Sequence, residues 1–313
     1  MASWKILITD GLDEGGLAFL RQQAEVDDIN GISADELLRV AGEYDAMIVR
    51  GRTKVTAAVF AAAGRLKVVG RAGVGVDNID LSAAKEHHVT VVNAPVSTTV
   101  AVAELAMGMM LSMARELPRA DASMKAGKWL KKEFEGVELY QKTLGVIGVG
   151  RIGSAVAARA TAFGMTCLGY DRFLTPDQIR TFGLKPVSLE ELYAQSDVIT
   201  LHVPLTAETR GMIGAAAFSQ MKPGVRLICT ARGGVIDEAA LLTALDSGAV
   251  ASAALDVFAT EPPGLTPLVS HPHLVATPHV GAQTLEAQQR ASKDISAEVM
   301  AGLKGEPLRW KVA

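Results

Sequence analysis

The stretch that decides the fold of this chain is Thr143-Leu144-Gly145-Val146-Ile147, followed directly by Gly148-Val149-Gly150-Arg151-Ile152-Gly153. The first five residues predict a buried strand, and the glycine-rich turn leads into a helical pattern that runs to Phe163. A second apolar run, Cys167–Tyr170, ends at Asp171, 18 positions after the last glycine (171 − 153). The strand, turn, helix, strand and acid together predict a dinucleotide-binding unit rather than an ordinary tight turn.

The three glycines of this turn have separate physical roles. Gly148 permits the tight turn, Gly150 lets the backbone approach a pyrophosphate, and Gly153 lets the helix pack closely on the strand. The start of the helix, at Arg151 and Ile152, offers unpaired N–H groups and a positive dipole to the phosphates. Asp171 would accept hydrogen bonds from a ribose diol and repel a 2′-phosphate, which predicts NAD rather than NADP as the cofactor.

Composition predicts a folded protein with a large core. The chain has 313 residues, of which 49% are hydrophobic and 21% charged, and two domains are expected at this length. The formal net charge of −3 argues against a nucleic-acid surface. The two cysteines, Cys167 and Cys229, lie in apolar runs, so we expect buried reduced thiols and no metal site. No signal peptide precedes Trp4, and the most apolar stretch, Val100–Ala114, is shorter than the ~20 residues of a membrane span, which predicts a cytoplasmic protein without a membrane segment.

Short apolar runs alternate with helical segments along the whole chain, which is typical of a parallel α/β architecture. We therefore expect two doubly wound parallel-sheet domains with a cleft between them. A flavodoxin-like substrate-binding domain is predicted from residues 1–98 plus 286–313, because the last helix is expected to return to the first domain. A Rossmann NAD-binding domain is predicted from residues 99–285. The expected strands are Lys5–Thr9, Ala46–Val49, Leu66–Val69, Val89–Val92, Leu144–Ile147, Thr166–Gly169, Val198–Leu201, Arg226–Cys229, Ala251–Leu255 and Leu274–Ala276.

Polar residues and glycines gather where the predicted strands end. In parallel sheets, ligands bind outside the carboxyl ends of the strands, so these residues are the candidates for a binding site. We expect cofactor on one wall of the cleft and substrate on the other. The strand ends are Arg50, Arg71-Ala72-Gly73, Asn93, Gly148, Asp171, His202, Thr230-Ala231-Arg232, Asp256 and Thr277-Pro278-His279.

Three late motifs carry the groups that hydride transfer from a 2-hydroxy acid requires: a base, a cation for the carboxylate and an orienter for the base. Arg232 follows a strand, and a guanidinium binds a carboxylate bidentately without losing its proton. His279 carries the side chain whose charge changes most readily near neutral pH. A neighbouring glutamate, Glu261, would favour the imidazolium and fix its orientation, and Asp256 offers a second carboxylate.

With these residues in view, the chain resembles the D-isomer-specific 2-hydroxyacid dehydrogenase family over nearly its whole length. The resemblance implies that Arg232, Glu261 and His279 form the catalytic triad. It also implies that the protein is an NAD-dependent oxidoreductase. The segments that carry the resemblance are Gly70–Asn78, Val91–Pro95, the Gly148 loop, His202–Pro204, Ala231–Gly234, Asp256–Phe258, Glu261-Pro262 and Pro278–Ala282.

The same resemblance implies which residues contact the ligands. The substrate contacts would come from Arg50, Arg52, Gly73, Val74 and Gly75, with Arg232. The cofactor contacts would be Val74, Gly148, Gly150, Arg151, Ile152, Gly153, Asp171, His202, Val203, Pro204, Thr230, Ala231, Asp256, Gly281 and Ala282.

The substrate that the resemblance favours is 3-phosphoglycerate, oxidised to 3-phosphohydroxypyruvate in the first step of serine synthesis. The loop from Val49 to Thr56 looks like the substrate loop of enzymes that act on this acid, although Gly51 and Arg52 stand where small residues such as serine and alanine are usual. Alternatives are a glyoxylate or hydroxypyruvate reductase, another D-2-hydroxyacid dehydrogenase, or, in a different class, a non-catalytic NADH-sensing binding protein.

The resemblance also bears on assembly and regulation. The segment Lys125–Trp129 resembles an interdomain arm that packs against a partner subunit, so a homodimer is expected. Lys131 or Lys132 of a partner could add cations for a phosphate. Because the sequence stops at residue 313, we expect no C-terminal regulatory domain and no feedback through one.

Overall fold

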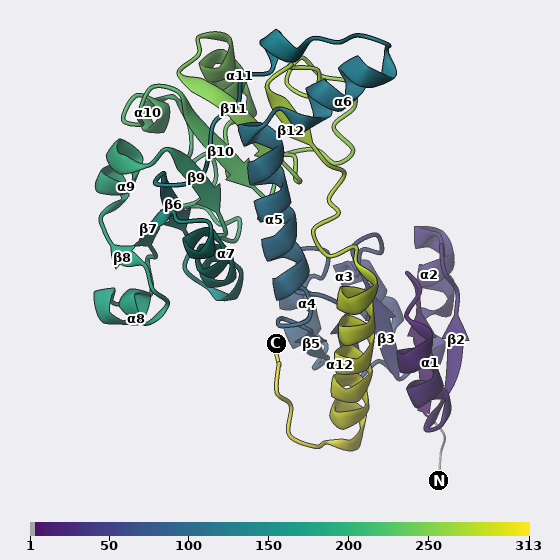
Figure 1. The fold of residues 1–313 in the computed structure, drawn as a ribbon. Coiled ribbons are helices and arrows are strands. Elements are labelled where there is room, and N and C mark those ends of the chain that lie inside the picture. Colours follow the sequence, from purple (N-terminus) through teal and green to yellow (C-terminus); the bar gives the residue numbers. More distant parts are fainter. Residues whose placement is uncertain (1–3) are drawn as a thin grey trace. The chain divides into compact units, whose positions relative to one another are not determined.

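Two parallel sheets organise residues 4–313, which are the residues that the computed structural model describes (Figure 1). One sheet lies in the unit formed by the described residues up to Thr99 together with Ala282–Ala313, and the other in the unit Val100–Gly281. The prediction of two parallel α/β sheets is confirmed.

The first unit has a five-stranded parallel sheet in the order β2-β1-β3-β4-β5, the flavodoxin-like order. Helices α1 and α12 bury Leu17, Leu20, Ile295 and Val299 on one face of the sheet, and α2, α3 and α4 cover the other face. The elements are β1 (Trp4–Ile8), α1 (Glu14–Arg21), β2 (Ala24–Asp28), α2 (Ala34–Val40), η1 (Ala41–Glu43), β3 (Ala46–Val49), α3 (Ala57–Ala62), β4 (Val68–Arg71), α4 (Leu81–Glu86), β5 (Thr90–Asn93) and α12 (Leu285–Lys304).

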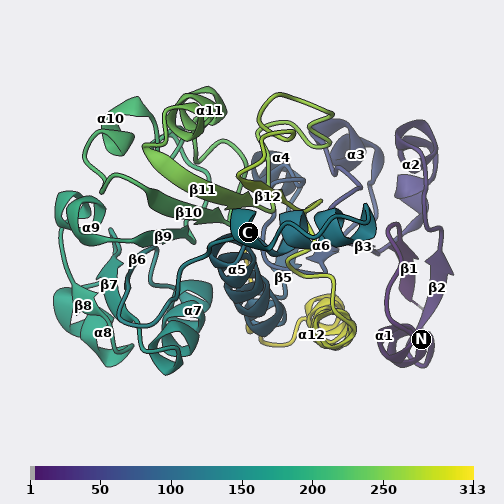
Figure 2. The same ribbon diagram turned by 45° about the horizontal axis from the view of Figure 1, so that its top comes forward.

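The second unit has a seven-stranded parallel sheet in the order β12-β11-β10-β9-β6-β7-β8 (Figure 2). Helices α5, α7 and α8 cover one face, and α9, α10 and α11 cover the other. The elements are α5 (Thr99–Ala114), α6 (Leu117–Lys125), η2 (Lys131–Glu133), β6 (Thr143–Ile147), α7 (Arg151–Ala162), β7 (Thr166–Tyr170), α8 (Pro176–Thr181), β8 (Lys185–Pro186), α9 (Leu189–Gln195), β9 (Val198–Leu201), α10 (Ala215–Phe218), β10 (Val225–Cys229), α11 (Glu238–Asp246), β11 (Val250–Leu255) and β12 (Leu274–Ala276).

The strand order of the second sheet places its ligand-binding point. The chain starts at β6, adds β7 and β8 on one side, and then crosses back to add β9 on the other side of β6. The carboxyl ends of β6 and β9 therefore flank the topological switch point, where dinucleotides bind in sheets of this order. Gly148 and His202 are the residues that follow these two strands.

Two strands were not predicted from the sequence, and both lie at sheet edges. β2 (Ala24–Asp28) pairs only with β1, and its residues are half-buried or exposed. β8 (Lys185–Pro186) pairs only with β7. Because an edge strand has one neighbour and little buried surface, it lacks the apolar run that reveals a central strand.

Several features of composition also have a place in the fold. Cys167 and Cys229 are buried free thiols, and burial raises the pKa of Cys229 to about 11. Across residues 4–313, no helix has the length and apolar character needed to cross a membrane. The same residues contain no group of three or more His, Cys, Asp or Glu side chains placed to hold a metal ion.

Candidate active site

Two of the three glycines in the Gly148–Gly153 turn are required by the fold itself. Gly148 has a φ of 91°, and an added Cβ would lie 2.5 Å from the carbonyl oxygen of His202. A Cβ on Gly153 would overlap the carbonyl oxygen of Gly148, because α7 packs directly on the turn. These two positions therefore exclude side chains whether or not a ligand binds.

Gly150 differs from both of its neighbours. Its φ of −74° is open to any residue, and an added Cβ would find no heavy atom within 4 Å. Gly150 is also the N-cap of α7, and it makes no side-chain capping hydrogen bond. The turn therefore presents open space beside the N–H groups at the start of α7, which is the arrangement that receives a phosphate.

Asp171 lies beside this turn at the end of β7. Its Oδ2 accepts a hydrogen bond from the Val149 N–H at 2.9 Å, and its Oδ1 accepts from the N–H groups of Phe173 and Leu174 at 2.9 and 3.2 Å. The carboxylate is thus fixed next to the glycine turn while its remaining lone pairs can accept from a diol. The neighbouring Arg172 lies near Glu208, with Nη1 3.9 Å from Oε1, in an exposed pair that contributes little to stability.

Two polar atoms are buried at the same edge of the sheet without a partner among the described residues. They are the Oγ1 of Thr230, after β10, and the Nδ1 of His202, after β9. The Nε2 of His202 lies 2.9 Å from the hydroxyl of Thr200, and burial lowers the pKa of His202 to about 4. The imidazole is therefore neutral at physiological pH. Because buried polar atoms are almost always hydrogen-bonded, both atoms are candidates for contacts to a bound molecule.

The loop that carries His279 is built on the buried Asp256. The Oδ1 of Asp256 accepts from the Thr277 hydroxyl at 2.6 Å and from the Val280 N–H at 2.8 Å, and its Oδ2 accepts from the Gly281 N–H at 2.9 Å. This side chain belongs to a residue that is 1% exposed. It fixes both sides of His279, whose backbone is held in the left-handed region at φ 54°.

The pairing of His279 with Glu261 is direct. The Nδ1 of His279 is 2.8 Å from the Oε2 of Glu261, and the other carboxylate oxygen accepts from the Phe258 N–H at 3.1 Å. The carboxylate therefore orients the ring and occupies Nδ1, which leaves Nε2 for a reacting group. The imidazole side chain is 50% exposed, as access to a ligand requires.

Arg232 sits in a glycine-bounded turn after β10. Gly234 has a φ of 82°, and a Cβ on Gly233 would overlap the carbonyl oxygen of Phe258. The turn of Arg232 therefore packs against the segment that leads from Asp256 to Glu261. The guanidinium Nη1 donates to the Ala231 carbonyl oxygen at 2.7 Å, which restricts its direction.

The predicted contacts of the first unit gather at the carboxyl edge of its own sheet. The Asn93 amide donates to the Val74 carbonyl at 2.7 Å, and the Ala94 N–H donates to the Gly73 carbonyl at 2.9 Å, which fixes the segment that runs on to Gly75. Arg50 follows β3, and its Nη2 reaches the Oε1 of Gln283 at 3.4 Å. Arg52 lies on Asp10 instead, with Nη2 3.1 Å from Oδ1.

The structure therefore brings the predicted residues together in two groups. Six of the predicted residues belong to the first unit: Arg50, Arg52, Gly73, Val74, Gly75 and Ala282. The remaining predicted residues belong to the second unit. Sequence reasoning missed Asp10 and Asn78, which organise the Arg50 loop. Asp10 follows β1 at the same sheet edge as the other candidates, and a complete survey of strand ends would have found it.

Comparison with known protein families places this site in context. Residues 107–281 match the family model described as the D-isomer specific 2-hydroxyacid dehydrogenase, NAD binding domain, which is more than half of the chain. The chain belongs to the D-isomer specific 2-hydroxyacid dehydrogenase family. Its glycine turn, Asp171, Arg232, Glu261 and His279 all fall within the matched region.

Relatives of this chain include proteins whose names state a substrate. The chain is 49% identical over 304 residues to D-3-phosphoglycerate dehydrogenase 2, chloroplastic, of Arabidopsis thaliana, covering 96% of this chain and 49% of that protein. It is 48% identical over 303 residues to D-3-phosphoglycerate dehydrogenase of Methanocaldococcus jannaschii, covering 96% of this chain and 58% of that protein. The chain thus spans about half the length of the curated relatives it matches.

A solved structure matches this member of the 2-hydroxyacid dehydrogenases along both chains. The crystal structure of a glyoxylate reductase from Paecilomyes thermophila has a TM-score of 0.91 and 32% identity, and the match covers 100% of this chain and 99% of that one. The fold of this chain is therefore also the fold of a protein described as a glyoxylate reductase.

The residues present fit the NAD that the family's binding domain implies. Gly150 leaves open space beside the uncapped start of α7, where a pyrophosphate needs close backbone approach. Asp171 offers carboxylate lone pairs for a ribose diol. The buried Thr230 hydroxyl and His202 Nδ1 offer polar atoms that no described residue satisfies.

Proposed function

We propose that this protein is an NAD-dependent D-3-phosphoglycerate dehydrogenase, which interconverts 3-phosphoglycerate and 3-phosphohydroxypyruvate in the first step of serine synthesis. The observation that carries the chemistry is the 2.8 Å contact between His279 Nδ1 and Glu261 Oε2. The choice of substrate is supported by relatives of that name at 49% and 48% identity.

His279 is the proposed acid and base. Because Glu261 accepts a hydrogen bond from the Nδ1–H group, Nε2 is the atom that exchanges a proton with the oxygen on carbon 2 of the substrate. In the oxidising direction Nε2 takes the hydroxyl proton, and in the reducing direction it returns that proton to the carbonyl oxygen. The Glu261 carboxylate stabilises the imidazolium that forms.

Arg232 is the proposed holder of the substrate carboxylate. A guanidinium binds a carboxylate with two parallel hydrogen bonds and stays charged at working pH. Held beside carbon 2, it also polarises the carbonyl in the reducing direction. The 2.7 Å bond to the Ala231 carbonyl fixes the direction in which the guanidinium points.

The proposed cofactor site uses the second unit. The N–H groups at Arg151 and Ile152 would bind the pyrophosphate over Gly150, and Asp171 would bind the adenine ribose. Further contacts to the cofactor are proposed for residues that follow the strands of this unit: Thr230, Ala231, His202, Val203, Pro204, Asp256 and Gly281. The chemistry that NAD supplies when bound is hydride transfer at carbon 2.

The proposed substrate site uses residues 1–98 and 286–313, which we assign as the substrate-binding domain, with residues 99–285 as the cofactor-binding domain. Arg50 would bind the 3-phosphate, and the Gly73-Val74-Gly75 backbone would line the substrate. Burial lowers the pKa of Arg50 against the opposing charge of Asp10, yet a guanidinium stays protonated. A partly desolvated cation is a stronger partner for a phosphate than an exposed one.

A glyoxylate or hydroxypyruvate reductase is the second candidate, because a glyoxylate reductase matches at a TM-score of 0.91. The proposed triad would serve both reactions. A phosphate on carbon 3 separates them, since glyoxylate and hydroxypyruvate carry no phosphate for Arg50 to bind.

A panel of 2-keto acids tests the proposal. The purified protein is mixed with NADH and 3-phosphohydroxypyruvate, hydroxypyruvate, glyoxylate or pyruvate, and the loss of NADH absorbance is followed. We expect kcat/KM for 3-phosphohydroxypyruvate to exceed kcat/KM for the other three acids by about 100-fold or more. This ratio corresponds to ~3 kcal/mol, the order expected for a partly desolvated pair of Arg50 with a phosphate. A preference for glyoxylate would assign the second candidate, and tight NADH binding without turnover would assign a sensor.

A homodimer and a cytoplasmic location are further parts of the proposal. Leu117, Met124 and Trp129, on and after α6, expose 51%, 55% and 77% of their surface, an apolar set that a second copy could cover. Sedimentation velocity should show a dimer that becomes a monomer in Trp129→Glu. Fractionation of cells should recover the protein with cytoplasmic markers.

A further inference from the structure

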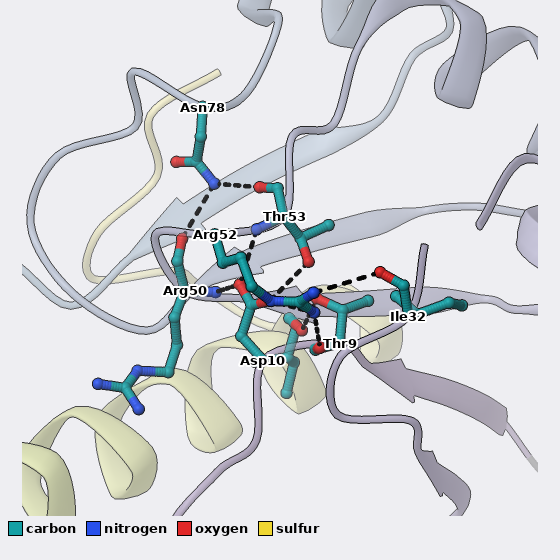
Figure 3. A network of polar contacts seen from close by, with 8 residues as sticks. Thr9, Asp10, Ile32, Arg50, Arg52, Thr53 and Asn78 are labelled. Atoms are coloured by element: carbon teal, nitrogen blue, oxygen red, sulfur yellow. Dashed lines mark hydrogen bonds and ion pairs between the residues drawn. The ribbon is translucent and has the colours of Figure 1, made fainter. Parts of the chain in front are cut away.

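The loop that carries Arg50 is held by one carboxylate on its N–H groups. The Oδ2 of Asp10 accepts from the Arg50 N–H at 2.7 Å and from the Thr53 N–H at 3.1 Å (Figure 3). Its Oδ1 accepts from the Thr53 hydroxyl at 2.6 Å. The Asp10 side chain is 5% exposed, so these bonds are shielded from competing water.

Asn78 holds the carbonyl groups of the same two residues. Its Nδ2 donates to the Arg50 carbonyl at 2.9 Å and to the Thr53 carbonyl at 2.6 Å. The two ends of the loop therefore have their N–H groups bonded to Asp10 and their C=O groups bonded to Asn78. Loops at a sheet edge usually leave such groups to solvent, and here two side chains fix all four.

Arg52 braces this arrangement from the other side of Asp10. Besides its ion pair with Oδ1, its Nη2 donates to the Thr9 carbonyl at 2.8 Å, and its Nη1 donates to the Ile32 carbonyl at 3.4 Å. Figure 3 shows the Arg52 guanidinium lying across Asp10, while the Arg50 guanidinium extends away from the cluster. The two arginines of one loop therefore have different surroundings.

We propose that Asp10 and Asn78 are positioning residues that clamp the backbone of Arg50 and Thr53, and so aim the Arg50 guanidinium at the substrate phosphate. Arg52 acts in this proposal as a brace on Asp10 and not as a second phosphate ligand. The inference rests on the proposed function, because it needs a phosphorylated substrate that Arg50 binds.

The charge state of Asp10 supports this role. Burial alone would raise its pKa, but the hydrogen bonds from Thr53 and Arg50 and the charge of Arg52 outweigh burial, so the pKa lies below its ordinary value. Asp10 is therefore ionised throughout the neutral range, and its bonds to the loop are charge-assisted and strong.

Kinetics of Asp10→Asn and Asn78→Ala with two substrates test the proposal. We expect KM for 3-phosphohydroxypyruvate to rise at least about ten-fold, because displacing a positioning group by ~1 Å costs on this order or more. Hydroxypyruvate has no phosphate for Arg50, so its KM should change by less than about two-fold. The Kd for NADH should also change by less than about two-fold, which corresponds to ~0.4 kcal/mol. An equal rise of KM for both substrates would show a merely structural role and overturn the proposal.

Asp45→Asn is the matched control for Asp10→Asn. The Asp45 side chain is 7% exposed and binds a backbone N–H, of Lys5 at 3.0 Å, and an arginine, Arg65 at 3.0 Å. It precedes β3, at the opposite edge of the same sheet. The control should lower Tm as Asp10→Asn does while leaving both KM values unchanged. If Asp10→Asn does not fold, Asn78→Ala and Thr53→Val carry the same test.

A double-variant cycle separates the brace from a direct ligand. If Arg52 acts through Asp10, the double variant of Asp10→Asn with Arg52→Ala should have the KM of Asp10→Asn alone. Multiplying effects would show that Arg52 binds the phosphate itself and would overturn its assignment as a brace. Arg65→Ala is the matched control, since Arg65 pairs with Asp45 and is similarly exposed, at 57% against 51%.

Arg50→Ala distinguishes failure of this inference from failure of the proposed function. If Arg50→Ala raises KM for 3-phosphohydroxypyruvate and the clamp variants do not, the phosphate contact stands and the clamp is refuted. If Arg50→Ala leaves that KM unchanged, the proposed phosphate contact itself is wrong.

Discussion

Replacing Gly150 by alanine should make the free protein more stable while weakening its hold on NADH. The φ and ψ of Gly150, −74° and −161°, suit an alanine, and the new methyl group would meet no heavy atom of the protein within 4 Å. A Gly→Ala change at such a position stabilises by about 0.4–1 kcal/mol, because it removes freedom from the unfolded chain. For a domain of this size we expect Tm to rise by about 1–3 °C.

The same methyl group would occupy the space through which a pyrophosphate approaches the start of α7. We expect the Kd for NADH to rise about 10- to 100-fold, a loss of ~1.4–2.7 kcal/mol. Fluorescence titration with NADH gives the affinity, and thermal unfolding without ligand gives the stability. Gly153→Ala should instead lower Tm, because its methyl group would overlap the Gly148 carbonyl oxygen.

A glycine elsewhere provides the control. A Cβ added to Gly64 would also meet no heavy atom within 4 Å, and its φ is not positive, so Gly64→Ala should leave NADH affinity unchanged. If Gly150→Ala binds NADH as tightly as the parent protein, the phosphates do not pass over this turn. If it instead lowers Tm as Gly153→Ala does, the open space inferred around Gly150 is wrong.

Four further outcomes are expected. His279→Ala should lower kcat by about 10²–10⁴-fold with little change in Kd for NADH, and unchanged turnover would remove His279 from the mechanism. Glu261→Gln should lower kcat by less, about ten-fold or more, because the amide oxygen still accepts a hydrogen bond from Nδ1–H but does not stabilise an imidazolium; an effect on KM alone would contradict this. Asp171→Ala should reduce the preference for NADH over NADPH, measured as a ratio of kcat/KM, and a parent enzyme that uses both equally would remove Asp171 from its role. Burial lowers the pKa of His202 from 6.5 to about 4, so the unfolded chain binds a proton more readily than the folded protein. The contribution of His202 to the free energy of unfolding is therefore fully present above pH 6.5, and it should fall by at most about 3 kcal/mol between pH 6.5 and pH 4. Urea unfolding at several pH values should show a smaller dependence on pH for His202→Gln than for the parent protein.

The central strands could be predicted from the sequence because burial imposes an apolar pattern on it. Strands such as Ala46–Val49 and Val198–Leu201 are buried along their whole length, and a short apolar run reveals them. The edge strand Ala24–Asp28 has acidic residues and one neighbour, so nothing in its composition distinguishes it from a loop. Its pairing with β1 depends on contacts that the sequence does not record.

The candidate site divides in the same way. The sequence alone determined the chemistry available to this protein, since a glycine turn after a strand, an arginine, a glutamate and a histidine each have properties fixed by their own atoms. Only the tertiary structure decided which groups are bound to which. In the folded protein, the Nδ1 of His279 is hydrogen-bonded to Glu261, and the Arg52 guanidinium forms an ion pair with Asp10. Gly150 has open space beside it, whereas a Cβ at Gly148 or Gly153 would overlap other atoms. The physical reason is that hydrogen bonds and close contacts depend on distances of a few ångströms between residues far apart in the chain, which packing sets and residue spacing does not.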